Sequence, residues 1–229
     1  LEDTRRKEIA SLKIQSAWRA HSVRKTSAQL MRQTFDCLMA NIENKPSQRI
    51  TRRSTTNGTV FTPDFYARMS REFLVYYNSR DDEQRFNSMI DLMMKNQDII
   101  IASKQKEPIL WLHRLCKLLK INLDLMAKQL SLNGDCDELY LGKYLDFLAY
   151  FTQASNNHAT PLTDTEASSI WQSLIELDLF KVMRRLADKS LRSQKTIGDD
   201  RRLLIIELVR RSLDVEPITR RGHYLMPVS

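Results

Sequence analysis

Hydrophobic residues recur along this chain at intervals of three and four positions, which is the period of an α-helix that buries one face. The clearest example is the set Phe65, Met69, Phe73 and Tyr76, which forms a single stripe on a helix predicted over 63–78. No stretch of the sequence alternates apolar and polar residues as a half-buried strand does. The pattern therefore predicts an all-α fold.

Capping residues and prolines set the predicted helix boundaries. Thr62-Pro63-Asp64 supplies an N-cap, a proline at the first helical position and an acid in the first turn. Thr163 is followed three positions later by Glu166, as in a capping box. The predicted helices are 2–42, 63–78, one that starts within 79–82, one that starts near 107 and ends at Asn133-Gly134, 136–153, 163–178, 178–193 and 199–213.

The helix predicted over 2–42 is much longer than the usual three turns, and neither Gly nor Pro interrupts it. We expect its first half to project and its second half to pack on the rest of the chain. A polar loop over 43–61 should separate it from a helical domain over 62–229. The stripe expected to pack consists of Leu30, Met31, Phe35, Leu38, Met39 and Ile42.

Composition agrees with a helical fold of substantial size. The chain has only 5 Gly and 6 Pro in 229 residues, and 42% of its residues are hydrophobic, which is enough for a continuous core. Helices of this length joined by short turns predict an α-solenoid-like stack of helical hairpins of the HEAT or armadillo type. Since no repeat of fixed length is visible, an irregular helical bundle is the alternative.

The positive charge is concentrated at the N-terminal end. Residues 1–60 hold 12 Lys or Arg against 5 Asp or Glu, a net charge of +7, which leaves +1 of the total +8 for the rest of the chain. Such a segment attracts acidic proteins, nucleic acid or anionic lipid. Because the sequence has neither a zinc finger nor an RNA-binding signature, binding to nucleic acid is the least favoured of the three.

Residues 14–24, IQSAWRAHSVR, lie within this basic segment and have the spacing of an IQ motif. Arg19 follows Gln15 by four positions and Arg24 follows Arg19 by five, while Ala20 stands where Gly is usual. Helices that present apolar anchors and cations bind the acidic lobes of calmodulin or a calmodulin-like light chain. The residues predicted to bind are Ile14, Gln15, Trp18, Arg19, Val23 and Arg24.

Two other interpretations of this run stay open. Ile14, Trp18 and Val23 could be the buried stripe of a helix that packs on its own domain. The run could also be a basic amphipathic helix that lies on an anionic membrane. No apolar stretch approaches the roughly 20 residues that a transmembrane helix needs.

Residues that usually carry catalysis or metal binding form no recognisable motif here. His113 and Cys116 lie three positions apart, but on a helix predicted to be buried, and no phosphate-binding or calcium-binding loop occurs. We therefore predict no catalytic residue, no metal site and no cofactor in these residues. The three cysteines are odd in number, widely spaced and form no CxxC pair, which favours a reducing, cytoplasmic location. The histidines and cysteines considered are His21, His113, His158, His223, Cys37, Cys116 and Cys136.

Several segments, taken in order, give the chain a resemblance to a known family. They are the IQ run 14–24, Phe73-Leu74 followed by Asp81-Asp82-Glu83-Gln84-Arg85-Phe86, Leu110-Trp111-Leu112, Tyr144-Leu145 with Leu148 through Phe151-Thr152, and His223-Tyr224-Leu225-Met226-Pro227-Val228. In these segments the chain resembles the N-terminal region of HECT-type ubiquitin ligases that carry an IQ motif, the 3B subgroup most closely.

The resemblance implies a non-catalytic helical region of a larger enzyme. The C-terminal domain of such an enzyme, absent from these residues, takes ubiquitin from a ubiquitin-conjugating enzyme onto a cysteine and passes it to substrate proteins. None of Cys37, Cys116 and Cys136 matches that cysteine. This region would bind calmodulin and would recruit substrates or regulate the transfer. The alternative is an IQ-motif adaptor with no enzymatic activity.

Overall fold

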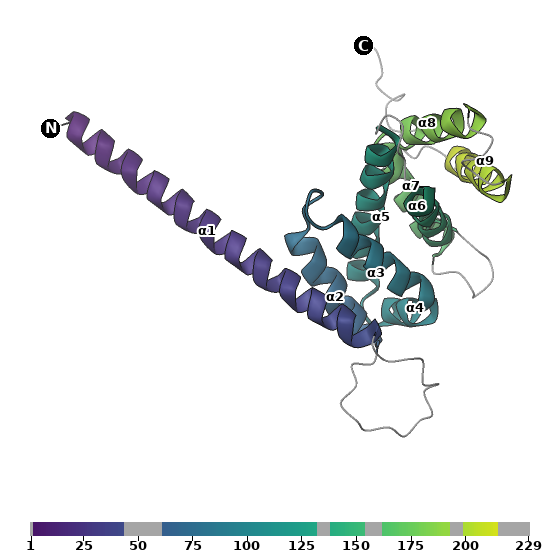
Figure 1. The fold of residues 1–229 in the computed structure, drawn as a ribbon, viewed down its shortest axis with the longest axis horizontal. Helices are drawn as coiled ribbons and strands as arrows, with labels where there is room; N and C mark the ends of the chain where they lie inside the picture. Colours follow the sequence, from purple (N-terminus) through teal and green to yellow (C-terminus); the bar gives the residue numbers. More distant parts are fainter. Residues whose placement is uncertain (1, 44–60, 132–137, 154–161, 193–198, 215–229) are drawn as a thin grey trace, which may run out of the picture. The chain divides into compact units, whose positions relative to one another are not determined.

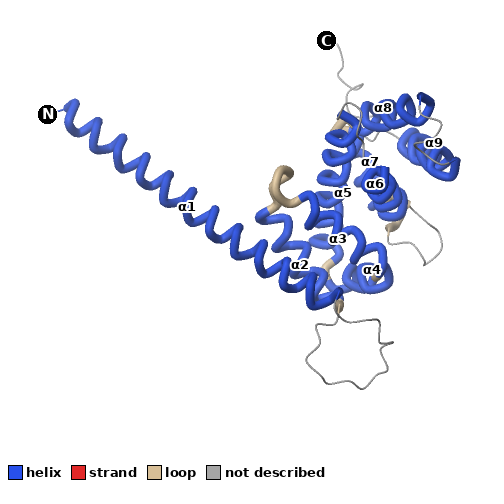
Figure 2. Tube along the Cα trace, viewed as in Figure 1, coloured by secondary structure: helices blue, strands red, loops and turns tan. Residues whose placement is uncertain are grey.

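A computed structural model describes residues 2–43, 61–131, 138–153, 162–192 and 199–214. This part of the chain is all-α, as the sequence predicts, with helices and no β-strand among the described residues (Figure 2). The helices are α1 (Glu2–Glu43), α2 (Pro63–Tyr76), α3 (Glu83–Lys95), α4 (Gln97–Lys106), α5 (Pro108–Ser131), α6 (Glu138–Phe151), α7 (Asp164–Ile175), α8 (Leu179–Arg192) and α9 (Asp199–Asp214), labelled in Figure 1.

The chain divides into two compact units, Leu1–Asn78 and Ser79–Ser229. The predicted extent of a repeat-like domain, 62–229, stays a prediction. The predicted loop falls largely on residues 44–60, and the predicted helix end at Asn133-Gly134 falls on 132–137; both stretches lie outside the described residues.

The first unit is a pair of helices, in which α2 packs against the C-terminal half of α1 (Figure 1). The Thr62 hydroxyl accepts a hydrogen bond from the Phe65 N–H at 3.2 Å, so the predicted N-cap is confirmed. The ring of Phe35 lies 5.7 Å from that of Phe73, and both side chains are buried. The predicted stripe Phe65, Met69, Phe73 and Tyr76 is buried throughout.

The packing predicted for the stripe on α1 is wrong at one residue. Leu30 is 64% exposed, whereas Phe35 and Met39 are buried. The reason is geometric, because five residues of helix rotate a side chain by about 140°, which turns Leu30 away from the side of Phe35. The position of α2 therefore determines which of the apolar residues of α1 are covered.

The core of the second unit is built around α5, which packs against α4, α6, α7 and α8. Trp111 is fully buried, and its indole N–H donates to the Ile100 carbonyl of α4 at 3.0 Å. Asn122 Nδ2 donates to the Tyr144 carbonyl of α6 at 2.9 Å. These two bonds satisfy polar groups at the centre of the unit, where an unpaired group would be costly.

Sequence reasoning missed one helix boundary in this unit and misplaced one side chain. Asn96 has a non-helical backbone, with φ −125° and ψ 42°, and it separates α3 from α4. The hydrophobic pattern alone does not resolve this boundary. Leu110 belongs to the helix that the sequence predicts to be buried, but its side chain is 54% exposed. It lies in the first turn of α5, next to the exposed Ile109.

The predicted capping box of α7 is confirmed and extends into a tertiary contact. The Thr163 N–H donates to Glu166 Oε2 at 2.8 Å, and the same carboxylate forms an ion pair with Lys104 of α4. Burial raises the pKa of Glu166, but the hydrogen bonds from Lys104 and Thr163 lower it by more, so the net shift is downward.

Replacing Glu166 with Gln should therefore destabilise the second unit by about 1 kcal/mol at pH 7. A carboxyl whose pKa is lowered on folding stabilises the folded state above its unfolded pKa of about 4.3, and loses that contribution as pH falls through the folded pKa. The difference between wild type and variant should thus shrink at pH 3 in urea denaturation. Equal differences at both pH values, or an equal loss in an exposed Glu176→Gln control, would contradict this assignment.

Candidate functional site

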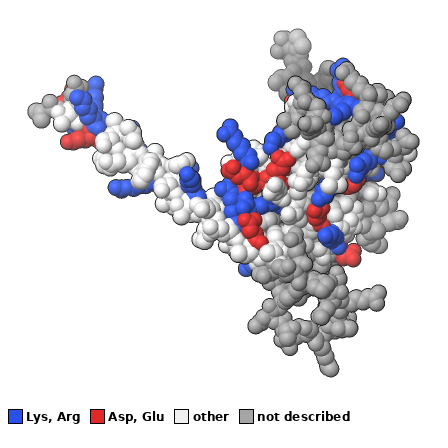
Figure 3. Space-filling model, in the orientation of Figure 1, with Lys and Arg blue, Asp and Glu red and all other residues white. Residues whose placement is uncertain are grey.

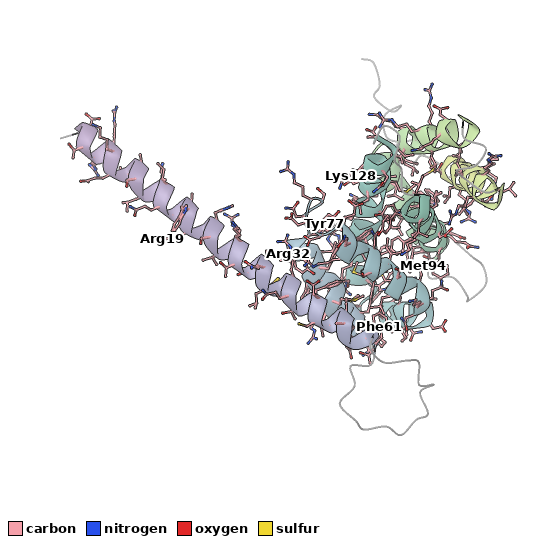
Figure 4. All side chains as sticks on the ribbon, viewed as in Figure 1. Arg19, Arg32, Phe61, Tyr77, Met94 and Lys128 are labelled. Atoms are coloured by element: carbon pink, nitrogen blue, oxygen red, sulfur yellow. The ribbon has the colours of Figure 1, made fainter. Side chains whose placement is uncertain are left out.

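The IQ residues lie on the part of α1 that α2 does not cover. Ile14, Trp18 and Val23 are 70%, 69% and 65% exposed, and every side chain from 11 to 21 is exposed. Figure 4 shows Arg19 on this uncovered half and Arg32 on the half that packs. Within the first unit, Ile14, Trp18 and Val23 are therefore not the buried stripe of a packed helix.

In this half of α1, the side-chain interactions join residues that lie four positions apart on the helix. Arg6 pairs with Glu2 at 2.9 Å, one turn away. Arg24 Nε donates to the Ala20 carbonyl at 3.1 Å, and Thr26 Oγ1 donates to the Ser22 carbonyl at 3.0 Å. Tertiary packing begins further along, where Arg32 donates to the Tyr76 carbonyl at 3.4 Å and lies over the Tyr76 ring. The half of α1 that carries residues 14–24 thus extends from the half that packs on α2.

The helix brings some of the predicted binding residues together and separates others. Ile14 and Trp18 are one turn apart on one side, and Gln15 and Arg19 form a second row beside them. Val23 follows Ile14 by nine residues, a rotation of about 180° on an ideal helix. The apolar anchors consequently lie on opposite sides of α1 rather than in one stripe.

A second exposed apolar row was missed by sequence reasoning. Leu12, Val23 and Leu30 are each well exposed and are separated by 11 and 7 residues, which places them within about 20° of one another around the helix. Ile9 is exposed and lies near the same side. The signal was present in the sequence as that 11- and 7-residue spacing.

Cations surround both apolar rows. The exposed side chains of this half include Arg5, Arg6, Lys7, Lys13, Arg19, Arg24 and Lys25. Figure 3 shows blue side chains spaced along α1. Arg19 forms no ion pair among the described residues, so its charge is available to an acidic partner.

The thiol and histidine considered for chemistry do not form a reactive pair. Burial raises the pKa of the Cys116 thiol, and nearby Lys120 opposes this only in part, so the thiol stays protonated at neutral pH and is a poor nucleophile. His113 is exposed on the same helix. Cys37 is exposed on α1, and Cys136, His158 and His223 lie outside the described residues.

Comparison with known proteins gives no match to a family model, a curated protein or a solved structure. Within the described residues, no helix combines the length and the hydrophobicity needed to cross a membrane. Function must therefore be inferred from the residues of α1 and their geometry.

Proposed function

We propose that residues 14–24 of α1 bind calmodulin or a calmodulin-like light chain. The observation that supports this most directly is the exposure of Ile14, Trp18 and Val23 on the half of α1 that α2 leaves uncovered, together with Arg19, which forms no ion pair among the described residues. Removing these anchors from water would stabilise a complex, and the cations favour a partner with acidic lobes. Gln15 and Arg24 complete the predicted contact set.

The placement of the anchors distinguishes this partner from two others. A membrane covers only one side of a helix, whereas Ile14 and Val23 lie on opposite sides of α1. A second copy of the chain would bring together two helices of net positive charge, which like-charge repulsion opposes. A partner that encloses the helix between acidic, apolar surfaces covers both rows and complements the charge.

The wider proposal is that the chain is the non-catalytic N-terminal region of an IQ-containing HECT-type ubiquitin ligase. The IQ run and the ordered segments described above support it. In such an enzyme a C-terminal domain would receive ubiquitin from a ubiquitin-conjugating enzyme, and this region would recruit substrate proteins or regulate transfer from a cytoplasmic location. The alternative is an IQ-motif adaptor without enzymatic activity. The mass of the native polypeptide distinguishes the adaptor from the ligase, since a ligase requires a much longer chain.

For the second unit we propose a solenoid-like stack of helical hairpins. Packing between sequence neighbours supports it, since α3 contacts α4, α4 contacts α5, α5 contacts α6, α7 contacts α8 and α8 contacts α9. One observation favours an irregular bundle instead, because α5 contacts α8 and α6 contacts α9. Whichever way consecutive helices are paired into hairpins, one of these contacts joins repeats that are not neighbours, whereas repeats in a solenoid contact only their neighbours.

Calorimetric titration of the chain with calmodulin, with calcium and with a calcium chelator, tests the binding proposal. We expect saturable binding in at least one of the two conditions, and affinity that falls as salt is raised because part of the attraction is electrostatic. Absence of binding in both conditions would contradict the proposal. Binding to anionic vesicles but not to calmodulin would favour the membrane interpretation.

A further inference from the structure

Ser27 follows two consecutive cations in the exposed part of α1. Arg24 and Lys25 stand three and two positions before it, and the side chains of all three are exposed. Protein kinases distinguish their substrates by charge patterns around the phosphorylated residue, and a kinase with acidic groups in its substrate cleft selects cations at these two positions. We propose that Ser27 is a phosphorylation site for a serine kinase that selects basic residues before its target, and that its phosphorylation weakens binding of an acidic partner to residues 14–24.

The position of Ser27 in the unit makes it reachable. A kinase binds its substrate in an extended form, so the helix must open locally around the target residue. Opening α1 near Ser27 breaks backbone hydrogen bonds of the helix and the bond from Thr26 Oγ1 to the Ser22 carbonyl, but leaves the buried contacts of Phe35 and Met39 in place. Segments with few buried contacts open at low free-energy cost.

Other serines of the same region lack this combination. Ser22 has a cation only three positions before it, at Arg19, and is half-buried. Ser11 is exposed but follows Glu8 and Ile9 at the two selecting positions. Ser11 is therefore a matched control on the same helix, and Ser27 is the serine of α1 that the charge pattern selects.

The reaction transfers the terminal phosphoryl group of ATP. Ser27 Oγ attacks the γ-phosphorus, and an Oγ–P bond forms as the bond between the γ-phosphorus and the β,γ-bridging oxygen breaks. ADP leaves with that oxygen, and the hydroxyl proton passes to a carboxylate of the kinase. The product carries a charge of about −1.5 to −2 at neutral pH.

That charge would act on the binding residues directly. Arg24 lies three positions before Ser27, where oppositely charged helical side chains pair, so the phosphate would neutralise the last cation of the IQ run. Val23 lies one turn before Ser27, which places the phosphate beside an apolar anchor. An acidic partner would then meet a negative group and lose one cation. This step rests on the proposed function.

The modification is tested on the full chain with ATP and the catalytic subunit of cAMP-dependent protein kinase as the probe enzyme. Mass spectrometry should place phosphate on Ser27, and the phosphopeptide that contains this position should be lost in Ser27→Ala, strongly reduced in an Arg24→Gln, Lys25→Gln variant and unchanged in Ser11→Ala. Incorporation that is absent from the wild type, or that survives Ser27→Ala unchanged, would overturn the site.

The regulatory effect is tested by titrating the unmodified and the phosphorylated chain with calmodulin. We expect the affinity to fall about tenfold on phosphorylation, and unmodified Ser27→Ala to bind as the wild type does. Equal affinities before and after phosphorylation would overturn the regulatory effect. Failure of the unmodified chain to bind would overturn the proposed function and the regulation together, whereas the modification site is judged by the mass spectrum alone.

Discussion

Replacing Ile14 and Arg19 together with glutamate is expected to weaken calmodulin binding by at least about a hundredfold. The change removes an apolar anchor and reverses a charge that forms no ion pair among the described residues, so an acidic partner would meet two new negative groups. Since Ile14 is 70% exposed and Arg19 is also exposed, the fold should be unaffected. Calorimetric titration gives the affinity, and circular dichroism with heating shows whether the helices and their stability are retained.

A matched control carries the same charge change on the second unit. Ile109 and Lys117 are both exposed on α5, so the Ile109→Glu, Lys117→Glu variant alters net charge equally without touching α1. We expect it to bind calmodulin as the wild type does, apart from a small long-range electrostatic effect. Equal weakening in both double variants would show that net charge, rather than the IQ residues, determines the affinity.

Replacing Trp111 with alanine should destabilise the second unit by about 3–5 kcal/mol. The side chain is fully buried, its N–H bonds to the Ile100 carbonyl at 3.0 Å, and Lys104 Nζ lies 5.7 Å from its ring centre. Truncation would open a cavity between α4 and α5 and leave the Ile100 carbonyl without this donor. Urea denaturation followed by circular dichroism measures the loss.

Trp111→Phe separates the two contributions of this side chain. Phenylalanine keeps an aromatic ring in the cavity but lacks the indole N–H, so we expect a loss of about 1–3 kcal/mol. An alanine variant within 1 kcal/mol of the wild type would contradict the central place of Trp111. A phenylalanine variant as unstable as the alanine variant would instead assign most of the energy to the hydrogen bond.

The presence of the helices and their first residues could be predicted from the sequence, because both depend on residues that are close together in the chain. Thr62 and Thr163 cap the helices that their sequence contexts predict. The division between α3 and α4 could not be predicted, because it depends on the backbone of Asn96, which no proline or glycine marks. Leu110 was misplaced because a hydrophobic period shows which residues share a face but not where the neighbouring helix ends.

The candidate site was predictable in composition but not in geometry. The spacing of Gln15, Arg19 and Arg24 indicated an IQ motif from the letters alone. We expected the first half of α1 to project, but the stripe itself left open whether Ile14 and Trp18 are covered, because an amphipathic stripe looks the same whether or not another element covers it. The row formed by Leu12, Val23 and Leu30 was overlooked since it spans more than the motif.

Because α1 is continuous, the distance and the direction between its two halves are fixed by the helix. One unbroken helix joins Trp18 to Phe35, and its 17 residues rise by 1.5 Å each. A partner bound at Trp18 would therefore lie roughly 25 Å along the helix axis from the half packed on α2. The direction from which that partner is presented is also set, since each residue between them turns the helix by about 100°. Adding or removing a single residue within this stretch would leave the anchors and the packed half intact, yet would point the partner to a different side.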